Sequence, residues 1–272
     1  MPTFTRDETA IAFTDTGVPA GAPDAQTIVF GHGLFFGGWM YAHQIEALSQ
    51  KYRCVTIDWR GQGETPAASA GYDMDSLTAD AVGLIEYLEL GPVHWVGLSM
   101  GGFVGMRLAA RHPQLLRSLT LFNTSSELDS PEANADNLKM AETIRGHGID
   151  SFKKGLADVL IGPDLRSETN GEAVVEDWLG RLAKVDPNGL ADAIRGVVKR
   201  EPVTAELVAI EAPTLVVAGA DDIAIPAVQG RAIASLIPGA RFSLVPGAGH
   251  ACTVDKPKET TEILEAFLEE IH

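Results

Sequence analysis

Residues 95–103 read WVGLSMGGF and contain the feature that decides the fold: a serine, Ser99, with glycines two positions before and after it, Gly97 and Gly101. The letters before it, VHWVGL, have the largely apolar pattern of a strand buried on both faces, and those after it, FVGMRLAARH, have helical spacing. A sharp turn between such a strand and helix strains the residue at its tip and makes neighbouring side chains collide, which glycine avoids. The stretch therefore predicts a strand–turn–helix unit that exposes the Ser99 hydroxyl.

Other runs along the chain share the apolar, β-branched composition of buried parallel strands. They are residues 26–31, 53–59, 118–123, 214–219 and 241–247. Segments with helical spacing alternate with them, which predicts a parallel sheet with helices on both faces. The opening segment, TFTRDETAIAFTDTG, predicts an antiparallel hairpin at the sheet edge that turns near Asp7 and Glu8. The expected fold class is therefore α/β, with a mostly parallel sheet flanked by helices.

One region interrupts this alternation. Between residues 125 and 209 the sequence shows helical segments separated or bounded by prolines, and no convincing strand. We therefore expect a core domain formed by residues 1–124 and 210–272, with a helical cap over residues 125–209. An insertion between two strands of one sheet is expected over the carboxyl edge, where open α/β folds bind ligands.

Composition bounds the partners and the compartment. The 272 residues carry a formal charge of −16, which argues against nucleic acid or an anionic membrane as a partner. The two cysteines, Cys54 and Cys252, form no disulfide framework, and a cytosolic chain would keep them reduced. The start lacks a signal-peptide pattern and no apolar run approaches the roughly 20 residues of a membrane span. We expect a cytoplasmic protein, and the oligomeric state stays open.

A serine nucleophile needs a base and an orienting carboxylate. Among the seven histidines, His250 follows the last expected strand directly, which places it at the same sheet edge as Ser99. His32, in the GHG after an earlier strand, is expected to shape its loop by hydrogen bonding. Asp221 and Asp222 both follow the strand over 214–219, and position alone leaves both open as the carboxylate.

An acyl-transfer site also needs donors for an oxyanion. One expected donor is the backbone N–H of Met100, the residue after the serine, and the other is that of Leu34, in the loop HGLFFGGW. The histidines show no zinc-type cluster, so we expect neither a metal nor an organic cofactor.

Five motifs together resemble the α/β-hydrolase superfamily, in its cap-bearing branch, over nearly the whole chain. They are VFGHGLFFGGW, DWRGQGET, VGLSMGGFVG, PTLVVAGADDIAIP and VPGAGH. In that family the acid usually stands four residues before a proline, in the pattern G-x-x-D-x-x-x-P, which Asp222 and Pro226 match and Asp221 does not. The resemblance thus implies Ser99 as nucleophile, Asp222 as acid and His250 as base.

Within the superfamily, the chain is most similar to carboxylesterases, enol-lactonases and other lactonases, and cofactor-free perhydrolases. This implies a serine hydrolase that cleaves a small-molecule carboxylic ester or lactone through an acyl-enzyme, without a cofactor. The alternatives are a perhydrolase or haloperoxidase-like enzyme, and a low-turnover ligand-binding protein on the same fold. Phe35, near the expected carbonyl site, and Trp178, in the expected cap, are candidates to line the substrate pocket.

Overall fold

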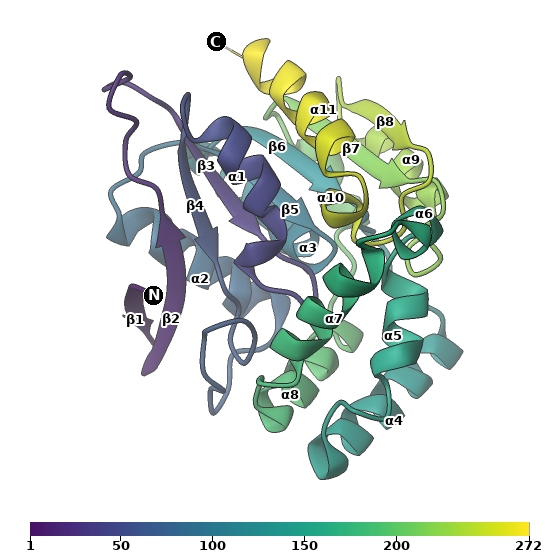
Figure 1. Cartoon of the computed structure of the whole chain (residues 1–272). Helices are drawn as coiled ribbons and strands as arrows, with labels where there is room; N and C mark the ends of the chain where they lie inside the picture. Colours follow the sequence, from purple (N-terminus) through teal and green to yellow (C-terminus); the bar gives the residue numbers. More distant parts are fainter. Residues whose placement is uncertain (272) are drawn as a thin grey trace.

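A single eight-stranded sheet forms the centre of the computed structural model, which describes residues 1–271 (Figure 1). Its strand order is β1-β2-β4-β3-β5-β6-β7-β8. The six strands from β4 to β8 run parallel, and β2 and β1 add an antiparallel edge. The bounds are β1 Thr3–Arg6, β2 Thr9–Asp15, β3 Thr27–Gly31, β4 Arg53–Ile57, β5 Val93–Leu98, β6 Leu116–Phe122, β7 Thr214–Gly219 and β8 Arg241–Val245. The predicted fold class is confirmed.

Helices cover both faces of the sheet (Figure 1). On one face lie α1 (Ala42–Leu48) and α11 (Pro257–Glu269), and on the other lie α2 (Met74–Tyr87), α3 (Met100–Arg111) and α9 (Ala227–Leu236). The short helix α10 (Cys252–Asp255) precedes α11, and three 3₁₀ helices span Gly38–Tyr41, Pro113–Leu115 and Thr204–Ala209. Within residues 1–271, no helix is long and apolar enough to cross a lipid bilayer.

Strand β5 shows why the parallel strands lack a simple alternation of polar and apolar residues. All six of its residues are buried. Trp95 packs into the hydrophobic cluster under α2 and α3, whereas its neighbour Val96 packs into the cluster on the opposite face. Successive side chains of a strand point to opposite faces, so a sheet covered on both sides has mostly apolar residues at both alternating sets of positions.

The antiparallel edge turns where the sequence predicts. Asp7 and Glu8 join β1 to β2, with φ of 45° and 63°. Two successive residues with positive φ give the hairpin turn whose twist matches that of the flanking strands. The edge hairpin is thereby confirmed, including its position.

Five helices are inserted between β6 and β7. They are α4 (Pro131–His147), α5 (Lys153–Leu160), α6 (Pro163–Ser167), α7 (Gly171–Leu182) and α8 (Pro187–Val198). All five lie within the interval expected for a cap, and Figure 1 shows them grouped together at one side of the sheet. Three of the five begin with a proline at the first helical position, where the missing N–H costs no hydrogen bond.

The strand order creates a crevice beside β3. From β3 the chain moves outward to β4, then crosses back to β5 on the other side of β3. The loops that follow β3 and β5 therefore leave the sheet in opposite directions from adjacent strands. Such a point is where doubly wound sheets bind their ligands. Leu34 follows β3 and Ser99 follows β5, so the topology brings these two together.

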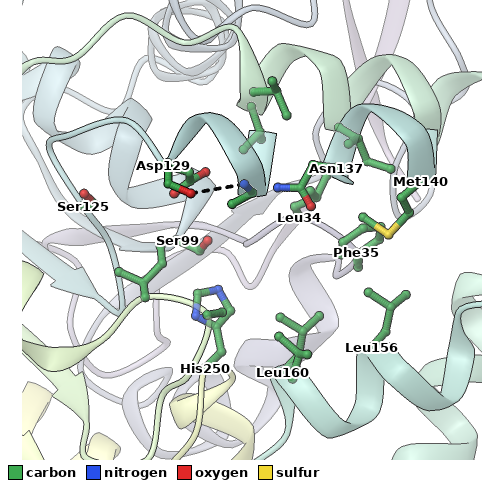
Figure 2. A pocket seen from close by; sticks show the side chains of 18 of the residues that line it. Leu34, Phe35, Ser99, Ser125, Asp129, Asn137, Met140, Leu156, Leu160 and His250 are labelled. Atoms are coloured by element: carbon green, nitrogen blue, oxygen red, sulfur yellow. Dashed lines mark hydrogen bonds between the residues drawn. The ribbon is translucent and has the colours of Figure 1, made fainter. Parts of the chain in front are cut away.

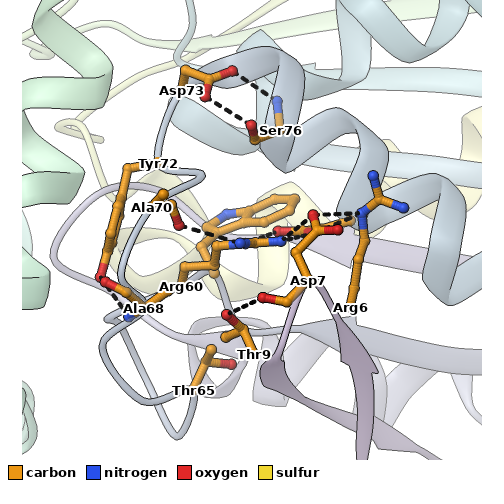
Figure 3. A network of polar contacts seen from close by, with 12 residues as sticks. Arg6, Asp7, Thr9, Arg60, Thr65, Ala68, Ala70, Tyr72, Asp73 and Ser76 are labelled. Carbon is orange, nitrogen blue, oxygen red and sulfur yellow. Dashed lines mark hydrogen bonds and ion pairs between the residues drawn. The ribbon is translucent and has the colours of Figure 1, made fainter.

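A buried ion pair anchors the long loop after β4 (Figure 3). The Arg60 guanidinium donates two hydrogen bonds of 2.7 Å to the Asp80 carboxylate of α2 and a third to the Ala70 carbonyl. The same loop carries Gln62, whose side-chain oxygen accepts a hydrogen bond of 2.9 Å from the Phe35 N–H. The network thus links the loop after β4 to the loop after β3 that borders the crevice.

Candidate active site

Ser99 sits at the tip of the turn between β5 and α3, in a conformation that few non-glycine residues adopt. Its φ is 52° and its ψ is −111°. A Cβ atom on Gly97 would collide with the Gly101 carbonyl, and one on Gly101 would collide with the Gly31 carbonyl. The two flanking glycines are therefore required by backbone contact, for the reason that the sequence indicates. The Ser99 carbonyl is itself held by a hydrogen bond of 2.8 Å from the Thr124 hydroxyl.

Ser99 and His250 lie in the wall of one cavity of about 690 Å³ between the sheet and the inserted helices. Both residues are largely buried, with exposed fractions of 7% and 5%. Figure 2 shows their side chains directed into this cavity. Among residues 1–271 no hydrogen bond joins them directly, and catalytic hydrogen bonds commonly tighten only when substrate binds.

The imidazole of His250 is oriented by Asp222. Its Nδ1 lies 2.9 Å from Asp222 Oδ2, and Asp222 Oδ1 accepts hydrogen bonds of 2.9 Å from the N–H groups of Ala224 and Ile225. Burial raises the pKa of the Asp222 carboxyl, but the facing His250 and these hydrogen bonds outweigh it, so the pKa lies below its usual value. Asp221, the other candidate from the sequence, is exposed.

Asn123 is a site residue that sequence reasoning missed. It follows β6 with a φ of 44°, and its amide nitrogen donates to Asp222 Oδ2 at 2.6 Å and to the Gly249 carbonyl at 3.1 Å. Its amide oxygen accepts a bond from the Gly219 N–H at 3.3 Å. One side chain thus links the ends of β6 and β7 to the loop after β8, which carries His250. The available signal was its place at the carboxyl end of a buried strand, the edge where the other polar residues gather.

Two backbone N–H groups are free at the expected oxyanion positions. In the described part of the chain, neither Leu34 nor Met100 donates its N–H to an acceptor. Met100 is the first residue of α3, so its N–H also lies at the positive end of the helix dipole. Leu34 lines the cavity, and the Gln62 bond to its neighbour Phe35 restrains the loop.

His32 occupies a structural position beneath this loop. It is fully buried, its Nε2 accepts a hydrogen bond of 3.1 Å from the Trp59 N–H, and its Nδ1 lies 2.8 Å from the Gly33 carbonyl. Nδ1 therefore carries the proton and donates to that carbonyl. Burial lowers the pKa of His32, which keeps the imidazole neutral. This agrees with the expectation that His32 shapes the loop.

The two candidates for pocket residues have different places. Phe35 lines the cavity (Figure 2). Trp178 does not belong to the lining; its indole N–H donates to the Phe35 carbonyl at 2.9 Å and its ring stacks on Phe36 at 5.3 Å. Position in the cap suggested substrate contact for Trp178, but its hydrogen bond and stacking direct it under the loop. It supports Phe35 from behind.

Comparison with known proteins identifies the family of the chain. The family model described as alpha/beta hydrolase fold matches residues 26–257. The chain is 30% identical over 247 residues to "Putative carbamate hydrolase RutD" of Pseudomonas syringae pv. syringae, covering 90% of this chain and 94% of that protein.

Two solved structures are similar over almost the whole chain. A thermophilic esterase from Thermogutta terrifontis has a TM-score of 0.90 and 28% identity, covering 100% of this chain and 97% of that one. The enol-lactonase from Burkholderia xenovorans LB400 has a TM-score of 0.90 and 27% identity, covering 98% and 100%. With the family match, these likenesses show that the chain belongs to the α/β-hydrolase family.

Proposed function

We propose that this protein is a serine hydrolase that cleaves a carboxylic ester or lactone through an acyl-enzyme intermediate. Ser99 is the nucleophile, His250 the general base and acid, and Asp222 the carboxylate that orients the base. The observation that carries the proposal is that His250, which lines the cavity together with Ser99 on its strained turn, lies 2.9 Å from Asp222.

In the first half of the reaction, the Ser99 oxygen attacks the substrate carbonyl carbon while the His250 Nε2 takes the hydroxyl proton. The free N–H groups of Leu34 and Met100 stabilise the negative charge that develops on the carbonyl oxygen. Collapse of the tetrahedral intermediate breaks the acyl–oxygen bond. The alcohol leaves with the proton from His250, and the ionised Asp222 stabilises the imidazolium formed in between.

In the second half, water replaces the alcohol. His250 removes a proton from the water as its oxygen attacks the acyl-enzyme, and then returns the proton to Ser99 as the acid product leaves. With a lactone, the released alcohol stays attached to the acyl group, and the same water step completes the reaction. We also propose that residues 125–209 act as a substrate-shaping cap, since α4, α5 and α8 contribute to the cavity wall.

The test uses nitrophenyl esters and three variants. Ser99→Ala should abolish hydrolysis with an almost unchanged melting temperature, and an alkylphosphonate probe should add its mass to the wild type but not to this variant. Asp222→Asn should be severely impaired, by about 10⁴-fold in kcat by analogy with other triads. Asp221→Asn, the matched control one position away, should keep most of its activity. Full activity in Ser99→Ala would refute the assignment of Ser99 as the nucleophile.

Two other functions would leave distinct signs. A perhydrolase would use the same acyl-enzyme, with hydrogen peroxide in place of water, so peracid formation would exceed hydrolysis when peroxide is added. A ligand-binding protein would react with the phosphonate yet turn over simple esters very slowly. Fast multiple turnover without peroxide supports the hydrolase.

A further inference from the structure

The cavity has two chemically different sides. Met140, Phe152, Leu156, Val159 and Leu160, from α4 and the α5 segment, form what we call the apolar wall. Figure 2 shows the labelled members of this wall on the same side of Ser99 as Phe35, with Ser125 and Asp129 on the other side. An acyl chain attached at Ser99 that extends along the apolar wall would contact mainly hydrocarbon.

The charged residues around the cavity also bear on which substrates it can bind. Among residues 1–271, no lysine or arginine side chain lines it, and Asp129 is the one carboxylate in the lining. A substrate carboxylate in this cavity would therefore find no lysine or arginine among the residues that line it. The whole chain, with a formal charge of −16, adds repulsion at longer range.

The arginine that neighbours this region is not available to a ligand. The Arg200 side chain is 3% exposed and donates to both oxygens of Asp129 at 3.1 and 3.3 Å. Its Nη1 and Nη2 also donate to the carbonyls of Val197 and Glu127, and the guanidinium lies 4.4 Å above the Phe103 ring. Both terminal nitrogens of the cation are thus bonded within the protein, and the guanidinium lies behind the ring that lines the cavity.

We propose that the site selects uncharged esters or lactones with an apolar acyl chain and discriminates against those whose acyl chain carries a carboxylate. The inference rests on the proposed function. Its physical basis is that an ionised carboxylate loses its hydration at the apolar wall and meets no cation there, only a neutral polar group, the amide of Asn137, which disfavours binding. By contrast, an apolar acyl chain gains about fourfold in affinity for each methylene group that it buries against the wall.

The experiment compares three esters of the same acyl length. The first is nitrophenyl hexanoate. The second is the mono-nitrophenyl ester of adipic acid, which is anionic. The third is the methyl nitrophenyl diester of adipic acid, which is polar at the chain end but uncharged. We expect kcat/KM to fall about 100-fold or more from hexanoate to the anionic ester, with the methyl diester much nearer to hexanoate. Repeating the series in 0.5 M salt removes the long-range repulsion, and most of the discrimination should persist.

A pair of variants tests where the discrimination arises. Met140 is partly buried in the apolar wall, so a longer polar side chain has room to adjust there. Met140→Lys should raise kcat/KM for the anionic ester about tenfold over the uncharged control Met140→Gln, because it supplies the missing cation. Equal gains in the two variants would show that polarity, not charge, limits the site.

The outcomes separate this inference from the proposed function. If wild type hydrolyses the hexanoate and the anionic ester equally well, the serine hydrolase stands and the charge selection is refuted. If none of the three esters is turned over and Ser99 takes no phosphonate, the proposed function fails and the selection fails with it. Discrimination that disappears in 0.5 M salt would likewise refute the local cause and leave only the charge of the whole chain.

Discussion

The buried carboxylate of Asp255 accepts hydrogen bonds both from the helical insertion and from the loop that carries His250. Its Oδ2 accepts hydrogen bonds from the Gly249 N–H at 2.7 Å and from the Gly162 N–H of the cap at 3.0 Å. Its Oδ1 is buried and has no partner in the described part of the chain. Nearby, the Ala251 N–H donates to the Leu160 carbonyl at 2.8 Å, so two residues that flank His250 take part in these contacts.

Burial makes this carboxyl group sensitive to pH near neutrality. Burial raises the pKa of Asp255 from 3.8 to about 7, although the two backbone hydrogen bonds and His250 lower it and Asp222 raises it further. Between pH 4 and pH 7 the folded protein therefore binds a proton that the unfolded chain releases. Stability falls as pH rises through this window, by about 4 kcal/mol in total for a shift of about 3 units.

Asp255→Asn should remove this loss of stability at higher pH while it keeps the two backbone hydrogen bonds. The amide oxygen can accept both backbone hydrogen bonds, and the amide does not ionise. The free energy of unfolding of the variant, relative to wild type, should therefore increase by about 2–3 kcal/mol between pH 5 and pH 8. Urea denaturation at several pH values measures this difference directly, without any activity assay.

A surface variant provides the control. Asp136 is an exposed carboxylate, and Asp136→Asn reports how a change of surface charge alone alters the pH dependence of unfolding. If the difference between Asp255→Asn and wild type stays constant from pH 5 to pH 8, or decreases, the reasoning about the buried carboxyl group is wrong. Asp255→Ala completes the set, since it loses the two hydrogen bonds and should be less stable than Asp255→Asn at every pH.

Three further predictions concern separate features. Asn123→Ala removes a hydrogen bond to an ionised carboxylate and should lower kcat/KM about 10- to 100-fold, with the circular dichroism spectrum unchanged. Asp80→Asn leaves the buried Arg60 with only the exposed Asp7 as an ionic partner and should cost about 3 kcal/mol in urea unfolding, whereas Asp136→Asn, in an exposed pair, should cost less than about 0.5 kcal/mol. Gly101→Ala should yield no folded protein because its Cβ meets backbone, whereas Gly180→Ala, in open space on a helix, should stabilise by about 0.5–1 kcal/mol in thermal melts.

Local patterns were enough to predict the architecture of the chain. A strand buried on both faces is largely apolar, as in 93–98 apart from His94, and a turn between strand and helix needs glycine where backbone approaches backbone. Because these requirements involve only a few neighbouring residues, they can be recognised in the sequence. The hairpin at Asp7 and Glu8 and the helical insertion between β6 and β7 were predicted in the same way.

Side-chain directions at the sheet edge depended on tertiary structure. Asp221 and Asp222 are adjacent in sequence, yet only Asp222 contacts His250, because successive residues in the turn after β7 point in different directions. Asn123 joins groups that lie 99 and 126 residues away, at Asp222 and Gly249. Contacts of this range leave no local pattern.

Charge and packing in the cavity likewise needed the fold. Trp178 is an aromatic residue that was expected to line the substrate pocket, but it donates to the Phe35 carbonyl and stacks on Phe36 instead. Arg200 is one of 21 basic residues in the sequence, and only its enclosure by Asp129 and Phe103 removes it from any role in binding anions. The sequence by itself determined which elements form and which groups gather at the sheet edge. Tertiary structure alone decided which of those groups touch, because burial and contact depend on distances between segments that are remote along the chain.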